Sequence, residues 1–138
     1  MERLRAYITP VLTVQRAALA VEFYKQAFGA VEVHRVTNPD GIVVAELTIE
    51  GAHFRVTDEA PEATDLSPQS LNGTTVRLNL LVADPDSLAE RALRNGAIAV
   101  APVVDRPYGL RQGRVADPFG HHWLIGRPLP GTGDWAWS

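Results

Sequence analysis

Cysteine is absent from this 138-residue chain, and its absence excludes several kinds of chemistry. Without thiols there is no disulfide, no thiolate nucleophile and no cysteine-based zinc site. The chain has 13 Lys and Arg residues and 16 Asp and Glu residues. The resulting formal net charge of -3 argues against nucleic-acid binding, which needs a basic surface. No apolar run approaches the roughly 20 residues of a membrane span or forms a signal-peptide core. We therefore expect a cytoplasmic protein that binds neither nucleic acid nor membrane.

What the chain does contain is one pattern that occurs twice. Each copy begins with a short apolar strand signal, Leu12-Thr13-Val14 in the first and Leu80-Leu81-Val82 in the second. A helix-like stretch follows each signal, over Ala17 to Phe28 and over Pro85 to Asn95. A Gly-Ala-apolar segment then comes at a similar distance in both copies, which indicates a duplicated module.

The two helix-like stretches carry matching end signals. Asp84 before Pro85 is typical of an N-cap followed by proline at the first helical position. Gly29 and Gly96 stand where a left-handed C-terminal residue is wanted. In the first helix, Leu19, Phe23 and Phe28 are expected to share the buried face, and Leu88, Ala92 and Leu93 are expected to do so in the second.

Three further strand signals follow each helix, separated by turn sequences such as Asn38-Pro39-Asp40-Gly41, Glu50-Gly51 and Asp117-Pro118-Phe119-Gly120. The strand order predicts an α+β protein, built from two tandem βαβββ modules that form a curved mixed sheet around a central cavity. We expect a single domain over 1–138. Its first module spans about 6–58, a linker spans 59–73, the second module spans about 74–127, and a C-terminal tail spans 128–138. Trp135 and Trp137 of that tail are expected to dock on the chain or on a partner subunit.

The sequence resembles the vicinal oxygen chelate superfamily, which includes glyoxalase I, bleomycin-resistance proteins and extradiol dioxygenases, and within it the PhnB-like branch. The matching segments are Ile8-Thr9-Pro10-Val11-Leu12, Val21-Glu22-Phe23-Tyr24-Lys25-Gln26-Ala27-Phe28-Gly29, Ala45-Glu46-Leu47 and Asp117-Pro118-Phe119-Gly120-His121-His122-Trp123. Metalloenzymes of this superfamily hold a divalent cation with His and Glu side chains from the first and last strands of each module. The corresponding positions here are Thr9, Arg55, Arg77 and Leu124. Because guanidinium groups repel cations, the resemblance implies a protein with no metal and no cofactor.

Strand alternation predicts which side chains face the cavity. Ala45, Leu47 and Ile49 are expected to face the helix, which leaves Glu46 on the concave side. A two-residue turn at Glu50-Gly51 would place Glu46 opposite Arg55 and predicts an ion pair there. This pair could be structural or could bind a ligand.

In the second module Arg77 and Asn79 are expected on the concave side, together with His122. Tyr108 and Arg111, in a segment similar to the superfamily's aromatic-Gly-x-Arg loop, would form the rim. With Thr9, Glu46 and Arg55 they predict a polar pocket with a positive surplus, suited to a small carboxylate, phosphonate or other anion. Arg77 and Arg111 could instead lie at a dimer interface or on the surface, and His122 could be structural or an acid or base.

Besides a subunit or domain that acts mainly through dimerisation, two functions remain open at this stage. The first is a metal-free protein that binds a small organic molecule in its cavity, as bleomycin-resistance proteins do. The second is a metal-dependent lyase, isomerase or dioxygenase with Glu46 as a contributing carboxylate. The resemblance also implies a homodimer in which modules of two chains share a cavity.

Overall fold

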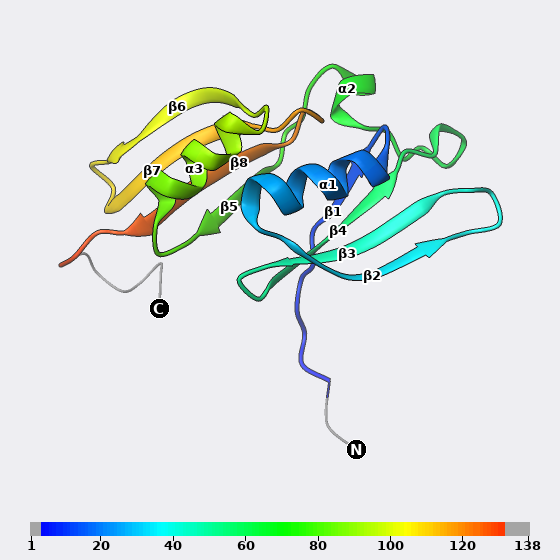
Figure 1. Ribbon diagram of the computed structural model, residues 1–138, viewed down its shortest axis with the longest axis horizontal. Coiled ribbons are helices and arrows are strands. Elements are labelled where there is room, and N and C mark those ends of the chain that lie inside the picture. The colour runs from blue at the N-terminus through cyan, green and yellow to red at the C-terminus, as the bar shows by residue number, and fades with distance from the viewer. Residues whose placement is uncertain (1–3, 132–138) are drawn as a thin grey trace.

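The computed structural model describes residues 4–131, and its elements follow the predicted order (Figure 1). The first module consists of β1 (Val11–Val14), α1 (Ala17–Phe28), β2 (Val31–Thr37), β3 (Val43–Ile49) and β4 (Ala52–Asp58). The second consists of β5 (Arg77–Leu81), α3 (Pro85–Arg94), β6 (Ile98–Asp105), β7 (Leu110–Ala116) and β8 (His122–Pro128). Trp135 and Trp137 lie outside the described residues.

The eight strands form two mixed sheets with the same topology. Their orders are β1-β4-β3-β2 and β5-β8-β7-β6, so the first strand of each module lies at one edge beside the last strand. In each sheet this pair is parallel and the other pairs are antiparallel. The α+β class and the duplicated βαβββ module are thus confirmed, and the strands divide into two four-stranded sheets within one chain.

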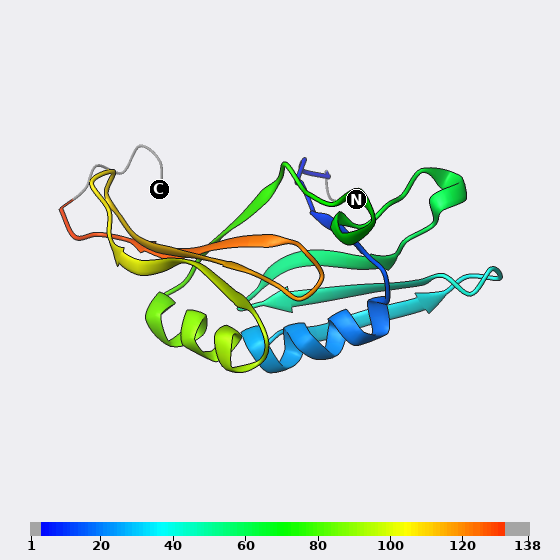
Figure 2. The same cartoon turned by 90° about the horizontal axis from the view of Figure 1, so that it is seen from above.

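The two helices cover one side of the molecule, and both sheets turn their other face to the opposite side (Figure 2). Successive side chains of a strand point to opposite faces, and as predicted Ala45, Leu47 and Ile49 are buried beneath α1. In the second sheet Val115, Trp123 and Ile125 fill the corresponding positions. Each sheet therefore has one apolar face committed to the core and one concave face that is free for other contacts.

The helix ends have the expected caps, but the predicted buried faces are partly wrong. The Asp84 carboxylate accepts a hydrogen bond from the Ser87 backbone N–H at 3.1 Å, and Gly29 ends α1 in the left-handed conformation. Leu19, however, is 53% exposed, while Tyr24 is fully buried. The buried face of α1 includes Ala20, Tyr24 and Ala27, because Tyr24 makes a hydrogen bond to the second module. Leu93 is likewise 40% exposed.

The linker contains two short helices that the sequence pattern did not predict. A 3-10 helix, η1 (Pro61–Ala63), is followed by the single-turn helix α2 (Pro68–Leu71). The buried Ser67 caps α2 by accepting from the Ser70 N–H at 3.2 Å. The Glu59 carboxylate accepts from the Ser67 N–H at 2.8 Å and from the Ser70 hydroxyl at 2.7 Å, which fixes this segment beside the first module.

A buried carboxylate joins the two modules. The Tyr24 hydroxyl on α1 donates to Asp117 of the second module at 2.5 Å, and the Trp123 indole N–H donates to the same oxygen at 2.9 Å. The other Asp117 oxygen accepts the backbone N–H groups of Phe119 and His121. Burial and the Asp117 carboxylate raise the pKa of Tyr24 well above its usual value, so this hydroxyl stays protonated and keeps donating. None of the helices in residues 4–131 has the length and apolarity to cross a membrane.

Candidate functional site

The concave face of the first module carries an acidic residue held between two basic ones. As predicted, Glu46 lies opposite Arg55 in the β3–β4 ladder, and the Arg55 Nε lies 3.3 Å from the Glu46 Oε1. His53 adds a contact that the sequence did not predict, with its Nδ1 3.3 Å from the Glu46 Oε2. The Glu46 side chain is 26% exposed and the other two are each 54% exposed, so this cluster is open to a ligand.

Thr9 lies beside this cluster. It precedes β1, whose Val11 pairs with Arg55, and the Arg55 backbone N–H donates to the Pro10 carbonyl at 2.8 Å. Thr9 and Arg55 together line a shallow cavity of about 420 Å³, whose other walls come from the N-terminal segment 4–7 and Val11. The structure therefore brings Thr9, Glu46 and Arg55 onto one face, as expected.

The concave face of the second module carries Arg77, Asn79 and His122. Arg77 pairs with His122 and Asn79 with Leu124 in the parallel β5–β8 ladder, so these four side chains share a face. Arg114 of β7 joins them, since its Nε donates to the His122 Nδ1 at 3.0 Å. Sequence reasoning missed Arg114. The register of β7 would have revealed it, because alternation places Gln112 and Arg114 on this face and Arg111 on the other.

A short hydrogen-bond relay fixes the outer part of this face. The Tyr108 hydroxyl donates to the Gln112 Oε1 at 2.7 Å, and the Gln112 Nε2 donates to the Asn79 Oδ1 at 3.5 Å. Gln112 is only 7% exposed, while Tyr108 is 55% exposed at the rim. Tyr108 thus lies at the rim as predicted, and it acts on Asn79 through the amide of Gln112.

The predicted position of Arg111 is wrong. Its guanidinium reaches the helix side of the sheet, where it donates to both carboxylate oxygens of Asp86 at 2.8 and 2.6 Å. A third hydrogen bond joins it to Asp105 at 3.0 Å. Arg111 lowers the pKa of Asp86, and this bidentate pair ties β7 to the first turn of α3. Arg111 therefore supports the fold on the far side of the candidate site.

His122 is held in its neutral form at neutral pH. Partial burial and the neighbouring Arg114 guanidinium both lower the pKa of His122. The hydrogen bond has the same effect, because an arginine N–H can only donate and the Nδ1 must accept. The ring proton then resides on Nε2, so His122 offers a hydrogen-bond donor to anything bound above the sheet.

The two polar groups do not meet within one chain. Among residues 4–131, no hydrogen bond or ion pair joins Glu46 or Arg55 to Arg77 or Asn79. The sheets lie side by side with both concave faces on the side away from the helices (Figure 2). The pocket predicted from all these residues is thus present as two separate half-sites.

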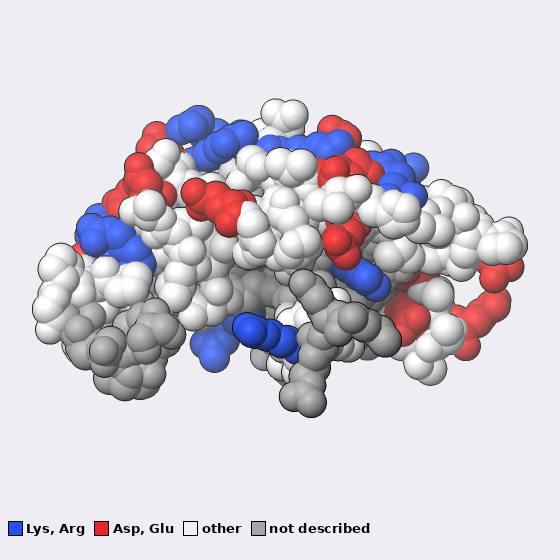
Figure 3. All heavy atoms as spheres, turned by 90° about the horizontal axis from the view of Figure 1, so that it is seen from below, with Lys and Arg blue, Asp and Glu red and all other residues white. Residues whose placement is uncertain are grey.

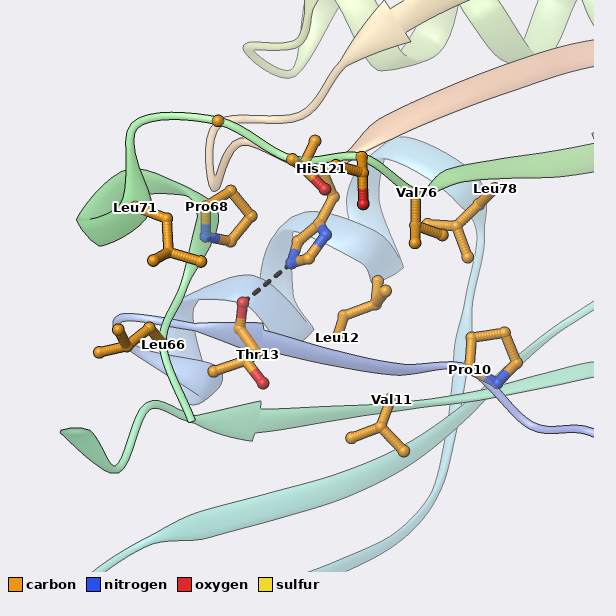
Figure 4. Close-up of a pocket in the computed structure, with 13 residues that line it drawn as sticks. Pro10, Val11, Leu12, Thr13, Leu66, Pro68, Leu71, Val76, Leu78 and His121 are labelled. Carbon is orange, nitrogen blue, oxygen red and sulfur yellow. Dashed lines mark hydrogen bonds between the residues drawn. The ribbon is translucent and has the colours of Figure 1, made fainter. Parts of the chain in front are cut away.

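A separate cavity lies where the modules adjoin. It measures about 640 Å³ and lies between β1 and the segment that leads from α2 into β5 (Figure 4). Leu12, Leu66, Leu71 and Val76 give it a mainly apolar wall. His121 closes one side, with its Nε2 2.9 Å from the Thr13 carbonyl. His121, which precedes β8, and His122, which begins it, thus face different environments.

The described residues do not provide the donor set of a divalent metal site. The four positions expected from the resemblance hold Thr9, Arg55, Arg77 and Leu124, and two of these are cations. Within residues 4–131 no group of three or more His, Cys, Asp or Glu side chains is placed to hold a metal ion. These side chains do not fit the superfamily's metal.

The distribution of charge also differs between the half-sites. The first balances Glu46 against Arg55, whereas Arg77 and Arg114 on the second form no ion pair with a carboxylate in the part of the chain that the structure describes. On the underside of the molecule, Lys or Arg side chains stand beside the recess at the middle of the lower edge (Figure 3). The second half-site can therefore attract an anion.

Comparisons with known proteins agree with this architecture. Residues 6–125 match the model of the glyoxalase/bleomycin resistance protein/dioxygenase superfamily. An uncharacterized protein of Mycobacterium bovis is 44% identical over 126 residues, which cover 88% of this chain and 83% of that protein. The crystal structure of an Arabidopsis thaliana gene product is 30% identical with a TM-score of 0.65, over 89% of this chain and 98% of that one. TioX from Micromonospora sp. is 27% identical with a TM-score of 0.66, over 91% of this chain and all of that one. The chain therefore belongs to the glyoxalase/bleomycin resistance protein/dioxygenase superfamily.

Proposed function

We propose that this protein binds a small organic molecule, of anionic character, on its concave faces and does so without the metal of the superfamily's enzymes. The observation that carries the proposal is the presence of Arg55 and Arg77 on the concave faces, at positions where the resemblance expects metal-binding side chains. A guanidinium binds carboxylate or phosphonate oxygens where a carboxylate would bind a cation. We also propose that the chain belongs to the PhnB-like branch of the superfamily.

The surroundings of the polar groups support a binding role. Large apolar side chains flank them, with Val11 and Val31 55% and 62% exposed on the first concave face. On the second, Leu81 and Ile98 are 39% and 64% exposed. Apolar walls around a few placed polar groups are the usual make-up of a small-molecule site.

Exposure of this kind on both faces also supports a homodimer. A partner that laid its second module over the first module of this chain would cover the apolar side chains and join the two half-sites. Glu46 and Arg55 from one subunit would then face Arg77 and Asn79 from the other. Light scattering after gel filtration is expected to give twice the chain mass of 15.0 kDa.

Two measurements on the purified protein test the proposed function. Elemental analysis is expected to find no stoichiometric Ni, Zn, Fe or Mn. Amide NMR spectra recorded with benzoate, phenylphosphonate, benzyl alcohol and benzylamine are expected to show shifts on the concave strands for at least one of the two anionic probes. A stoichiometric metal, or four probes that leave the concave strands unchanged, would overturn the proposal, and the metal would favour the metal-dependent enzyme.

A further inference from the structure

The second concave face offers hydrogen-bond donors and has its side-chain acceptors already engaged. The His122 Nδ1 accepts from Arg114, and the Asn79 Oδ1 accepts from Gln112. The Gln112 Oε1 in turn accepts from Tyr108. What remains free to point at a ligand is the Nε2–H of His122, the amide N–H groups of Asn79 and the outer N–H groups of the arginines.

Position in the sheet brings these donors together. Strand order places β8 between β5 and β7, with neighbouring strands about 4.8 Å apart. Arg77 pairs with His122, while Arg114 pairs with Leu124 and reaches His122 diagonally through the hydrogen bond at 3.0 Å. Arg77 has no hydrogen-bond or ion-pair partner among residues 4–131, and it is exposed. Both guanidinium groups share this face, and both would be stabilised by a shared anion.

The charge on this face indicates how much negative charge the anion carries. Two guanidinium groups stand there, His122 is neutral, and neither guanidinium forms an ion pair within the described part of the chain. In the proposed dimer, Glu46 and Arg55 of the other subunit would add no net charge to this count. A monocarboxylate offers one charge and two oxygens. A terminal phosphonate or phosphate monoester carries about −1.5 to −2 charges near pH 7 and three acceptor oxygens, which matches two arginines and two neutral donors better.

We infer that the second module is a receptor for a terminal –PO₃²⁻ group, contacted by Arg77, Arg114, His122 and Asn79. This inference rests on the proposed function and names the class of its ligand. Tyr108 and Gln112 are positioning residues, since they orient the Asn79 amide without touching the ligand. Leu81 and Leu124 share this face and provide an apolar surface for the organic part of the ligand.

Calorimetric titration with matched aromatic probes tests the inference. Phenylphosphonate is expected to bind at least about tenfold more tightly than benzoate at pH 7.5, because charge-assisted hydrogen bonds add up over the extra oxygen and charge. Benzylamine is expected not to bind this face. Phenyl phosphate serves as a further arm, and whichever of the two phosphorus probes binds more tightly identifies the natural source of the group.

Variants assign the binding to the named residues. Arg77→Gln and Arg114→Gln are each expected to weaken phenylphosphonate at least about tenfold while weakening benzyl alcohol less than twofold. Arg94→Gln is the matched control, because it removes the same charge from the outer side of α3, where Arg94 pairs with Glu90 at 3.0 Å. Thermal unfolding of each variant verifies that it folds. If Arg114→Gln does not fold, Arg77→Gln still tests the inference, because Arg77 has no partner among residues 4–131 that the substitution would remove.

The outcomes separate this inference from the function on which it rests. Benzoate bound as tightly as phenylphosphonate, or an Arg77→Gln variant that binds phenylphosphonate unchanged, overturns the –PO₃²⁻ receptor. If benzoate still shifts the concave strands in that case, the proposed binding of a small anionic molecule stands and only the ligand class is wrong. If no probe shifts them, both fail.

Discussion

Replacing Tyr24 by Phe removes one hydroxyl from the contact that joins the modules. Tyr24 is fully buried, and its hydroxyl donates to an Asp117 carboxylate that is 2% exposed. The ring can remain among Phe28, Phe54 and Trp123, which lie 6.0, 5.4 and 5.6 Å from it between centroids. Packing is therefore retained, and the variant isolates the hydrogen bond.

The size of the effect follows from the charge of the acceptor. A hydrogen bond to a charged group contributes about 1.5–3 kcal/mol, and Asp117 keeps its three other donors. We expect Tyr24→Phe to lower the free energy of unfolding by about 2 kcal/mol. For a chain of this length that corresponds to a fall in Tm of about 5–10 °C.

Urea unfolding followed by tryptophan fluorescence measures this change, since Trp123 donates to the same carboxylate. Tyr108→Phe is the control, because it removes a similar hydroxyl from a rim residue that is 55% exposed. It is expected to cost about 1 kcal/mol, less than Tyr24→Phe, because its acceptor is the neutral amide of Gln112. A Tyr24→Phe variant as stable as the Tyr108→Phe control would refute the argument that this hydrogen bond holds the modules together.

Three further changes test other parts of the structure. Gly113→Ala is expected to lower the free energy of unfolding by about 1–3 kcal/mol, because an added Cβ would lie 2.6 Å from the Val103 Cγ2 and 2.8 Å from the Val103 backbone nitrogen. Gly73→Ala is the control, because the space around Gly73 is open. Equal denaturation midpoints for the two variants would contradict the clash. A double-mutant cycle with Glu46→Gln and Arg55→Gln is expected to give a coupling of about 0.2–1 kcal/mol, since Arg55 is 54% exposed, and a much larger value would show a pair buried in the assembly. Because the pKa of His122 is lowered on folding, the unfolded chain binds its proton more readily, so stability falls as the pH drops below about 6.5. His122→Gln is expected to reduce that fall in denaturant titrations between pH 7.5 and 5, and an unchanged pH profile would contradict it.

The fold was predictable from the sequence because its signals are local and occur twice. Asp84-Pro85 and Gly29 mark helix ends through backbone chemistry that depends on few distant residues. The turn at Glu50-Gly51 likewise fixes the β3–β4 register, and with it the Glu46–Arg55 pair. These features follow from residues a few positions apart.

The features that were missed depend on contacts between distant segments. Tyr24 is buried in place of Leu19 because the second module lies beside that face of α1, which helical periodicity alone does not reveal. Arg111 was placed on the wrong face because its side was judged from a loop similarity, and the strand register decides it. The separation of the half-sites follows from how the modules pack, which has no local signal.

The contact that Arg91 makes between the modules bears on how the chain folds during its synthesis. Its side chain on α3 donates from Nε to the Gln26 carbonyl at 2.7 Å and from Nη2 to the Lys25 carbonyl at 3.4 Å, near the end of α1. The last turn of the first helix is thus completed by a residue that leaves the ribosome more than 60 positions later. Until then the nascent first module has neither this cation nor the Asp117 partner of Tyr24. We therefore expect the first module to remain loosely packed on the ribosome and to reach its final structure only when the second module emerges.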